Sequence, residues 1–172
     1  MEYLIVSTLP PQYEGVAELI GQLAETLPQA EVVYTQQMKI SACLGCNSCW
    51  LKTPGRCPIH DDYEPLMLKF LQVKAVVFVC DTKLGFLSYQ TKNLFDRILP
   101  LATMYLTIVD GQMRHIPRYH KNLAAAVLYT GQSDNAYLNR WLARAMLNLH
   151  GVSLGAYPFE EKGAAFDALA HC

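Results

Sequence analysis

Four cysteines stand close together, and their spacing is the feature of the sequence with the most chemical meaning. Cys43, Cys46, Cys49 and Cys57 form the pattern C-x2-C-x2-C-x7-C. A [4Fe-4S] cluster needs four thiolates, which a tight loop and a returning segment can supply together. Zinc also takes four thiolates, although structural zinc sites usually pair two C-x2-C motifs across a longer insert. These four residues are therefore candidate metal ligands; the alternatives are cysteines that bind nothing and act as small packing residues, or zinc or a dithiol switch.

Other residues with reactive side chains are weaker indications of function. Cys80 ends an apolar run and is expected to pack in the core, whereas Cys172 is terminal. His60 is either a ligand or a surface residue before a helix. Asp96 and Arg97 are expected to pair on a helix surface or at an interface. Because the chain has no Ser-His-Asp, nucleophile-elbow or P-loop pattern, hydrolase and phosphotransferase functions have little support.

Composition limits the class of protein. The 172 residues are 52% hydrophobic and 17% charged, which is enough for one core and predicts a single domain over residues 1–172. With a net charge of -1 and no basic run, nucleic acid is not an expected partner. The apolar stretch at residues 3–6 is too short for a signal peptide, and no segment approaches the length of a membrane span. We therefore expect no membrane partner and a cytoplasmic, reducing location, where clustered cysteines indicate metal binding or redox chemistry.

Alternating strands and helices must position these residues. Apolar runs predict strands at residues 3–6, 31–34, 73–80, 123–129 and 152–157. Helical patterns lie between them at residues 16–27, 62–71, 88–99 and 134–149, with Asp61 or Asp62 and Asp134 as caps. This alternation predicts an α/β fold with right-handed crossovers and a doubly wound parallel sheet.

Ligands of such sheets bind beyond the carboxyl ends of the strands, where the strand order reverses. The residues that follow the strands are therefore informative, namely 7–15, 80–88 and 130–135, and we expect the cysteine loop to join this rim. Residues 105–122 form a long connection that predicts an excursion or a partner contact.

Several stretches carry a family resemblance. Residues 42–50 (ACLGCNSCW) and 57–62 (CPIHDD) resemble the cysteine segment of the NADPH-dependent FMN reductase superfamily, especially its iron-sulfur flavoprotein branch. Residues 85–97 resemble that family's second flavin loop with the helix that leaves it, and residues 110–115 and 117–119 resemble a further stretch. The resemblance implies a flavodoxin-like three-layer sandwich with a five-stranded parallel sheet in the order 2-1-3-4-5. It also implies FMN as prosthetic group, NAD(P)H as co-substrate, and a homodimer or tetramer.

The resemblance also assigns flavin-binding residues on three loops. They are Thr8, Gln12 and Gly15 on the first loop, Thr82, Lys83, Leu84, Gly85 and Ser88 on the second, and Thr130 and Gly131 on the third. The first loop departs from the family's Gly-Ser start and basic residues: Pro10 and Pro11 lack N–H donors, and Glu14 repels a phosphate. The family's Ser-Pro-x-aromatic sequence is replaced by residues 80–83 (CDTK), where Lys83 would place a cation near the pyrimidine end of the flavin.

Three functions follow as hypotheses. The first is an FMN-dependent oxidoreductase that takes hydride from NAD(P)H and passes electrons to a quinone, another small acceptor or a protein. The second is an iron-sulfur flavoprotein that exchanges electrons with a ferredoxin-like protein through the cysteine loop. The third is a flavodoxin-like scaffold that has lost FMN and binds a partner. A small-molecule electron donor and acceptor are thus the expected partners of the first.

Overall fold

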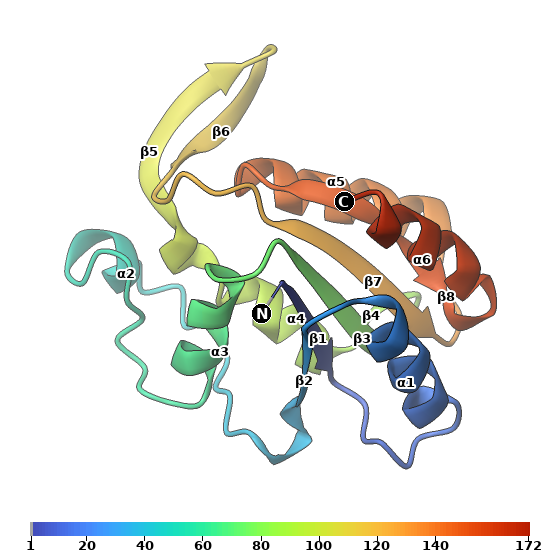
Figure 1. Ribbon diagram of the computed structural model, residues 1–172. Coiled ribbons are helices and arrows are strands. Elements are labelled where there is room, and N and C mark those ends of the chain that lie inside the picture. The colour runs from blue at the N-terminus through green and yellow to red at the C-terminus, as the bar shows by residue number, and fades with distance from the viewer. Residues whose placement is uncertain (1) are drawn as a thin grey trace.

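Five parallel strands form the central sheet of the computed structural model, which describes residues 2–172 (Figure 1). The strands are β1 (Tyr3–Ser7), β2 (Ala30–Tyr34), β3 (Ala75–Lys83), β7 (Ala124–Thr130) and β8 (Val152–Pro158). Their order in the sheet is β2-β1-β3-β7-β8, and each neighbouring pair is parallel. The predicted order 2-1-3-4-5 is confirmed, and with it the flavodoxin-like α/β fold.

Helices cover both faces of this sheet and give three layers. One face packs against α3 (Tyr63–Phe70), α4 (Tyr89–Asp96) and α5 (Asn135–Asn148), and the other against α1 (Val16–Thr26) and α6 (Lys162–Ala170). Every residue of β1 is buried, as expected for a strand covered on both sides. Helix α6 was not predicted from the sequence, because its alanine-rich segment buries only Ala165 and Leu169 and has little apolar periodicity.

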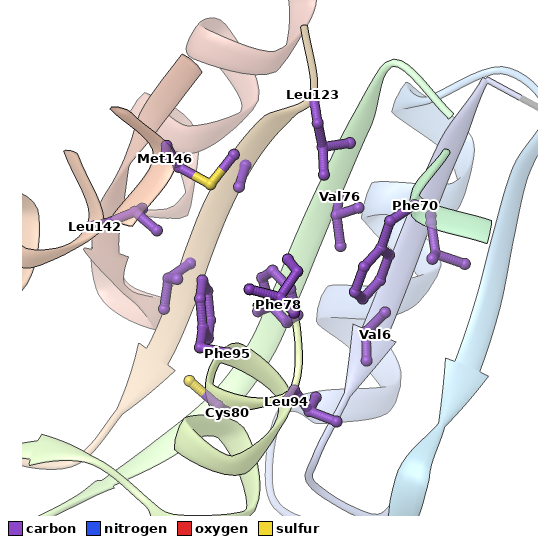
Figure 2. Packing of buried hydrophobic residues seen from close by; sticks show 14 of the residues in the cluster. Val6, Phe70, Val76, Phe78, Cys80, Leu94, Phe95, Leu123, Leu142 and Met146 are labelled. Carbon is purple, nitrogen blue, oxygen red and sulfur yellow. The ribbon is translucent and has the colours of Figure 1, made fainter. Parts of the chain in front are cut away.

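The core on the α3–α4–α5 face is built around aromatic contacts (Figure 2). The Phe78 ring on β3 lies 4.7 Å from the Phe95 ring and 6.1 Å from the Phe70 ring, measured between centroids. Cys80 is fully buried in the same cluster, which confirms its predicted packing role. Burial raises the pKa of the Cys80 thiol to about 12. The thiol therefore stays protonated and unreactive at neutral pH.

Aspartate side chains accept hydrogen bonds from backbone amides at the start of two helices, near where the sequence placed them. Asp134 accepts a hydrogen bond from the Tyr137 amide at 2.9 Å and so caps α5. Asp61, two residues before α3, accepts one from the Tyr63 amide at 3.1 Å. The predicted helix 88–99 ends earlier, at Asp96, and a short 3-10 turn containing Pro100 follows at Leu99–Leu101. Further short elements are Thr35–Gln37, α2 (Ser48–Leu51), β4 (Phe86–Leu87) and Phe159–Glu161.

The long connection predicted at residues 105–122 is an antiparallel hairpin that projects from the body (Figure 1). Strands β5 (Ala102–Val109) and β6 (Gln112–Pro117) pair with each other in a separate sheet. Asp110 and Gly111 turn the chain with φ values of 51° and 72°, as the tight turns of hairpins require. Several large apolar side chains on it are exposed, among them Tyr105, Ile108 and Met113. None of the helices formed by residues 2–172 is long and apolar enough to cross a bilayer.

Candidate functional site

The candidate site lies at the carboxyl ends of β1 and β3, where the strand order reverses. Strand β1 pairs with β2 on one side and β3 on the other, so the loops after β1 and β3 leave the sheet side by side. The Thr8 amide confirms this closeness by donating to the Val79 carbonyl at 2.9 Å. A doubly wound sheet offers its ligand site at this position.

The first loop turns its hydroxyl groups into the protein. Ser7 Oγ donates to the Leu9 carbonyl at 2.7 Å, and the buried Thr8 and Thr91 hydroxyls share a hydrogen bond of 2.7 Å. Gln12 and Gly15 are exposed, and Gly15 has φ 76° at the start of α1. A Cβ at Gly15 would meet nothing within 4 Å. The predicted residues Gln12 and Gly15 therefore face an open space, whereas Thr8 ties this loop to α4.

Exposed Glu14 stands in the same loop as Gln12. No lysine or arginine lies within the loop itself. A phosphate here would meet the amide groups that open α1, which favour an anion, and a carboxylate that opposes it.

The second loop is a tight turn between β3 and β4. Lys83 pairs with Phe86 across the turn, and Leu84 and Gly85 between them have φ values of 52° and 78°. A leucine in the left-handed region is strained by roughly 1–3 kcal/mol. Its side chain is also fully exposed, so its packing does not offset the strain. A strained residue at the ligand edge of a sheet is a candidate ligand contact.

Lys83 forms an ion pair in this loop. Its ammonium group lies 3.2 Å from a carboxylate oxygen of Asp81, and its side chain is largely exposed. The predicted positive charge near a flavin is therefore partly neutralised by its neighbour.

The second and third loops are held together. Thr82 Oγ1 lies 2.9 Å from the Gln132 carbonyl and 3.2 Å from the Thr130 carbonyl, which both accept from it. Ser133 Oγ donates to the Gly85 carbonyl at 2.9 Å. Gly131 packs so closely that a Cβ would lie 2.7 Å from Thr82 Oγ1. Because several contacts fix them, these loops present a preformed surface.

Ser88 supplies an unsatisfied polar group beside this surface. Its amide donates to the Asp81 carbonyl at 3.1 Å, and the residue is 2% exposed. Within the described part of the chain, its hydroxyl has no hydrogen-bond partner. A buried hydroxyl without a partner costs free energy unless a ligand or water completes it. A ligand that hydrogen-bonds at this edge of the sheet would complete the Ser88 hydroxyl.

The cysteine segment lies elsewhere, and the expectation that it joins the ligand rim is wrong. Trp50 Nε1 in α2 donates to the Leu99 carbonyl at 2.9 Å, and the Trp50 ring lies 5.0 Å from that of His115. These contacts place the segment at the C-terminal end of α4, whereas Ser88 stands at its N-terminal end. The eight residues of α4 separate the two by about 12 Å. Cysteine spacing alone could not show that α4 separates this segment from Ser88.

The four thiols of this segment differ in environment. Cys43 and Cys46 are exposed, Cys57 is partly buried and Cys49 is buried. Burial raises the pKa of Cys49, and the neighbouring thiol groups of Cys57, Cys43 and Cys46 raise it further. Hydrogen bonding with Ser48 lowers the pKa of Cys46. Among residues 2–172, no group of three His, Cys, Asp or Glu side chains has a metal-holding arrangement, so the cluster stays a prediction.

Arg97 corrects a second expectation. Its side chain is fully buried and pairs with Asp61, not with its neighbour Asp96, which instead pairs with Lys92 on the helix surface. Nη1 and Nη2 of Arg97 lie 2.7 and 3.1 Å from the two carboxylate oxygens of Asp61. A buried arginine is rare, and its partner stands far along the chain, so helical spacing could not reveal the pair. The CPIHDD motif at residues 57–62 contains Asp61, but nothing in the motif indicates that Asp61 pairs with Arg97.

Comparison with known proteins finds similarity in sequence and in fold. No family model matches the chain. Over 96 residues it is 31% identical to an iron-sulfur flavoprotein of Methanocaldococcus jannaschii, a match covering 53% of this chain and 49% of that protein. The chain thus spans about half the length of this curated relative.

Two solved structures share its fold. The first is an NAD(P)H:quinone oxidoreductase from Methanothermobacter marburgensis, with a TM-score of 0.63 and 13% identity over 98% of this chain and 95% of that one. The second is general stress protein 14 of Treponema denticola in complex with FMN, with a TM-score of 0.55 and 12% identity over 99% and 97%. At such low identity these structures establish the fold.

Proposed function

We propose that the chain is an FMN-dependent NAD(P)H oxidoreductase, because it has the flavodoxin-like fold and is similar over part of its length to an iron-sulfur flavoprotein. Its electrons pass to a quinone, another small acceptor or a protein. The observation that carries the proposal is the preformed surface of the second and third loops, with the unsatisfied Ser88 hydroxyl beside it. When bound, FMN would supply the hydride and electron chemistry.

The residues of the three loops would bind and orient the ring. Ser88 would hydrogen-bond the polar edge of the ring, and exposed Leu84 would cover an apolar part of it and exclude water. Thr82 and Gly131 would keep the second and third loops at a fixed separation. Gln12 and the amide of Gly15 would bind the phosphate, while the Glu14 carboxylate would repel it and weaken its binding.

Reconstitution tests this proposal directly. Purified protein is titrated with FMN while the flavin fluorescence is followed, and bound flavin is counted after gel filtration. We expect one FMN per chain. A protein that leaves flavin fluorescence unchanged at any FMN concentration would contradict the proposal and favour the scaffold that binds a partner.

A second candidate function is that of an iron-sulfur electron carrier with a ferredoxin-like partner. Its support is the similarity to the Methanocaldococcus protein together with the four thiols on one segment. Iron analysis after anaerobic purification separates the two functions, since a carrier of this kind requires about four irons per chain. Protein that binds FMN but contains no iron would leave only the reductase.

We also propose that the chain forms the homodimer or tetramer that the family resemblance implies. The exposed apolar side chains of the β5–β6 hairpin support a contact between subunits there. Light scattering combined with gel filtration measures the mass, and a monomer at all concentrations would contradict this assembly.

A further inference from the structure

An open hollow of about 440 Å³ lies along α5, which belongs to an outer layer of the sandwich (Figure 1). Its volume falls in the range of small-molecule sites, about 300–1,000 Å³. The lining comes from α5 alone and combines two aromatic side chains, two arginines and two smaller residues: Tyr137, Arg140, Trp141, Arg144, Ala145 and Asn148. None of these residues was assigned to the flavin, so the hollow is a separate feature of the molecule.

A second hollow, of about 190 Å³, continues the first between α4 and α5. The two share Trp141, Ala145 and Asn148, so they form one groove, which we call the α5 groove. The lining of the second part is mostly apolar and includes Phe95 on α4 and Leu149 after α5. The α5 groove therefore has a polar, open part and an apolar part.

Packed side chains hold the walls of the α5 groove in place. The centroid of the Trp141 ring lies 4.8 Å from that of Phe95 and 5.2 Å from that of Phe86, with the rings edge to face. At the end of the groove near the hairpin, His150 Nε2 lies 2.8 Å from the carbonyl oxygen of His115, which also lines the apolar part. The groove is thus preformed, with Trp141 as an aromatic wall shared by both parts.

Arg140 and Arg144 place two positive charges on the open part of the groove. They stand one helical turn apart, so their side chains are neighbours on the surface of α5. Both are exposed, and within residues 2–172 neither side chain takes part in an ion pair or a hydrogen bond. Like charges at this spacing destabilise a helix, and an anion bound between them would remove the repulsion.

The other charged side chains of the groove neutralise each other. Lys92 and Asp96 on α4 line the apolar part and form an ion pair with one another. The net charge of the α5 groove is therefore that of the two arginines. Guanidinium groups bind carboxylates and sulfonates with paired hydrogen bonds, and aromatic side chains pack favourably against flat rings.

We propose that the α5 groove binds a flat aromatic molecule that carries one anionic group, a carboxylate or a sulfonate. Its ring packs against Trp141 in the apolar part, and its anionic group lies between Arg140 and Arg144. Because four residues of a helix rise by about 6 Å, both guanidinium groups can reach one anion. The inference does not depend on the flavin, since the whole lining of the groove comes from the chain itself.

The test is equilibrium dialysis of flavin-free protein against 2-naphthoate, with 2-naphthamide as a neutral ligand of the same shape. Ultraviolet absorbance measures the bound ligand. We expect one site per chain and an affinity for 2-naphthoate about tenfold higher than for 2-naphthamide. Arg140→Gln and Arg144→Gln should each weaken 2-naphthoate about three- to tenfold and leave 2-naphthamide unchanged.

A substitution in the apolar part and a matched control complete the design. Ala145→Leu narrows the groove where its two parts meet, so the affinity for both ligands should fall about tenfold. Arg56→Gln makes the same change at an exposed arginine that pairs with Glu64 in front of α4 and α5, outside the groove, and should alter neither affinity. Circular dichroism verifies that each variant is folded, which is expected because the substituted arginines are exposed.

The proposal is overturned if 2-naphthoate shows no saturable binding, or if it binds no more tightly than 2-naphthamide. Unchanged 2-naphthoate affinity in both Arg140→Gln and Arg144→Gln also overturns it. If 2-naphthoate does not bind and Arg140→Glu converts a dimer into a monomer, the groove is an interface between copies of the chain instead. FMN titration of the same samples is a separate result, so failure of the proposed oxidoreductase function leaves this site standing.

Discussion

The guanidinium group of Arg97 and the carboxylate of Asp61 form two hydrogen bonds and are both buried, although Arg97 follows α4 and Asp61 precedes α3. The distances of 2.7 and 3.1 Å describe a bidentate ion pair. The centroid of the Tyr63 ring lies 4.8 Å from the guanidinium carbon of Arg97. The pair joins the helix that leaves the second ligand loop to the segment that carries the cysteines. Its removal should therefore affect stability far more than a surface pair would.

The first prediction concerns this stability. Arg97→Met leaves the Asp61 carboxylate buried without its cation, which should lower the free energy of unfolding by about 3–5 kcal/mol. Asp96→Asn is the matched control, because it breaks a surface pair one residue away and should cost less than about 1 kcal/mol. Urea unfolding followed by circular dichroism measures both. If both variants lowered the free energy of unfolding by the same small amount, the buried pair would not be a major contributor to stability.

The second prediction is the pH dependence of the same pair. The pKa of Asp61 is lower in the folded protein than in the unfolded chain, so its stabilisation is present above the ordinary carboxyl range and is lost as the pH falls through the folded value. The stability difference between wild type and Asp61→Asn should thus be constant near neutral pH and shrink below about pH 4. Urea midpoints at a series of pH values measure it. A difference that does not change down to about pH 2 would contradict the lowered pKa.

A third prediction concerns the phosphate end of the flavin site. Glu14→Gln removes a charge that repels the FMN phosphate near the start of α1, so FMN affinity should rise about two- to fivefold. Riboflavin, which has no phosphate, should bind wild type and variant alike. Glu25→Gln at the other end of α1 is the control substitution and should change neither affinity. An unchanged FMN affinity in Glu14→Gln would place the phosphate away from this loop.

The fourth prediction concerns the ring end. Ser88→Ala removes a buried hydroxyl that has no partner within residues 2–172, so protein without flavin should be as stable as wild type or more so. Affinity for FMN and for riboflavin should both fall about fivefold, the effect of one lost hydrogen bond. Thermal unfolding without flavin and fluorescence titration with each ligand measure the two effects. A loss of stability without a loss of affinity would assign Ser88 to the fold alone.

Much of the fold could be predicted from the sequence, because strands buried on both faces are continuous apolar runs. The runs ending at Val6 and Cys80 mark β1 and β3, and strand order followed from the family resemblance. The β5–β6 hairpin was anticipated only as an excursion, because its exposed apolar residues do not alternate with polar ones as in a half-buried strand.

The site was predicted less completely. Spacing identified the cysteines but could not show that they lie at the far end of α4 from Ser88. That placement depends on Arg97 and Asp61, which are 36 positions apart and meet only through the packing of α3 against α4. Thr8 was expected to hold a ligand, yet its hydroxyl pairs with Thr91, a contact across 83 positions that no local pattern contains.

Anaerobic reduction of the reconstituted protein tests the proposed oxidoreductase function most directly. FMN-loaded protein, freed of excess flavin, is mixed with NADPH or NADH without oxygen, and the visible flavin absorption is followed before and after a benzoquinone is added. We expect that one of the two donors bleaches the absorption and that the quinone restores it. Bound FMN that stays oxidised with both donors, while dithionite still bleaches it, would contradict the assignment as an NAD(P)H oxidoreductase.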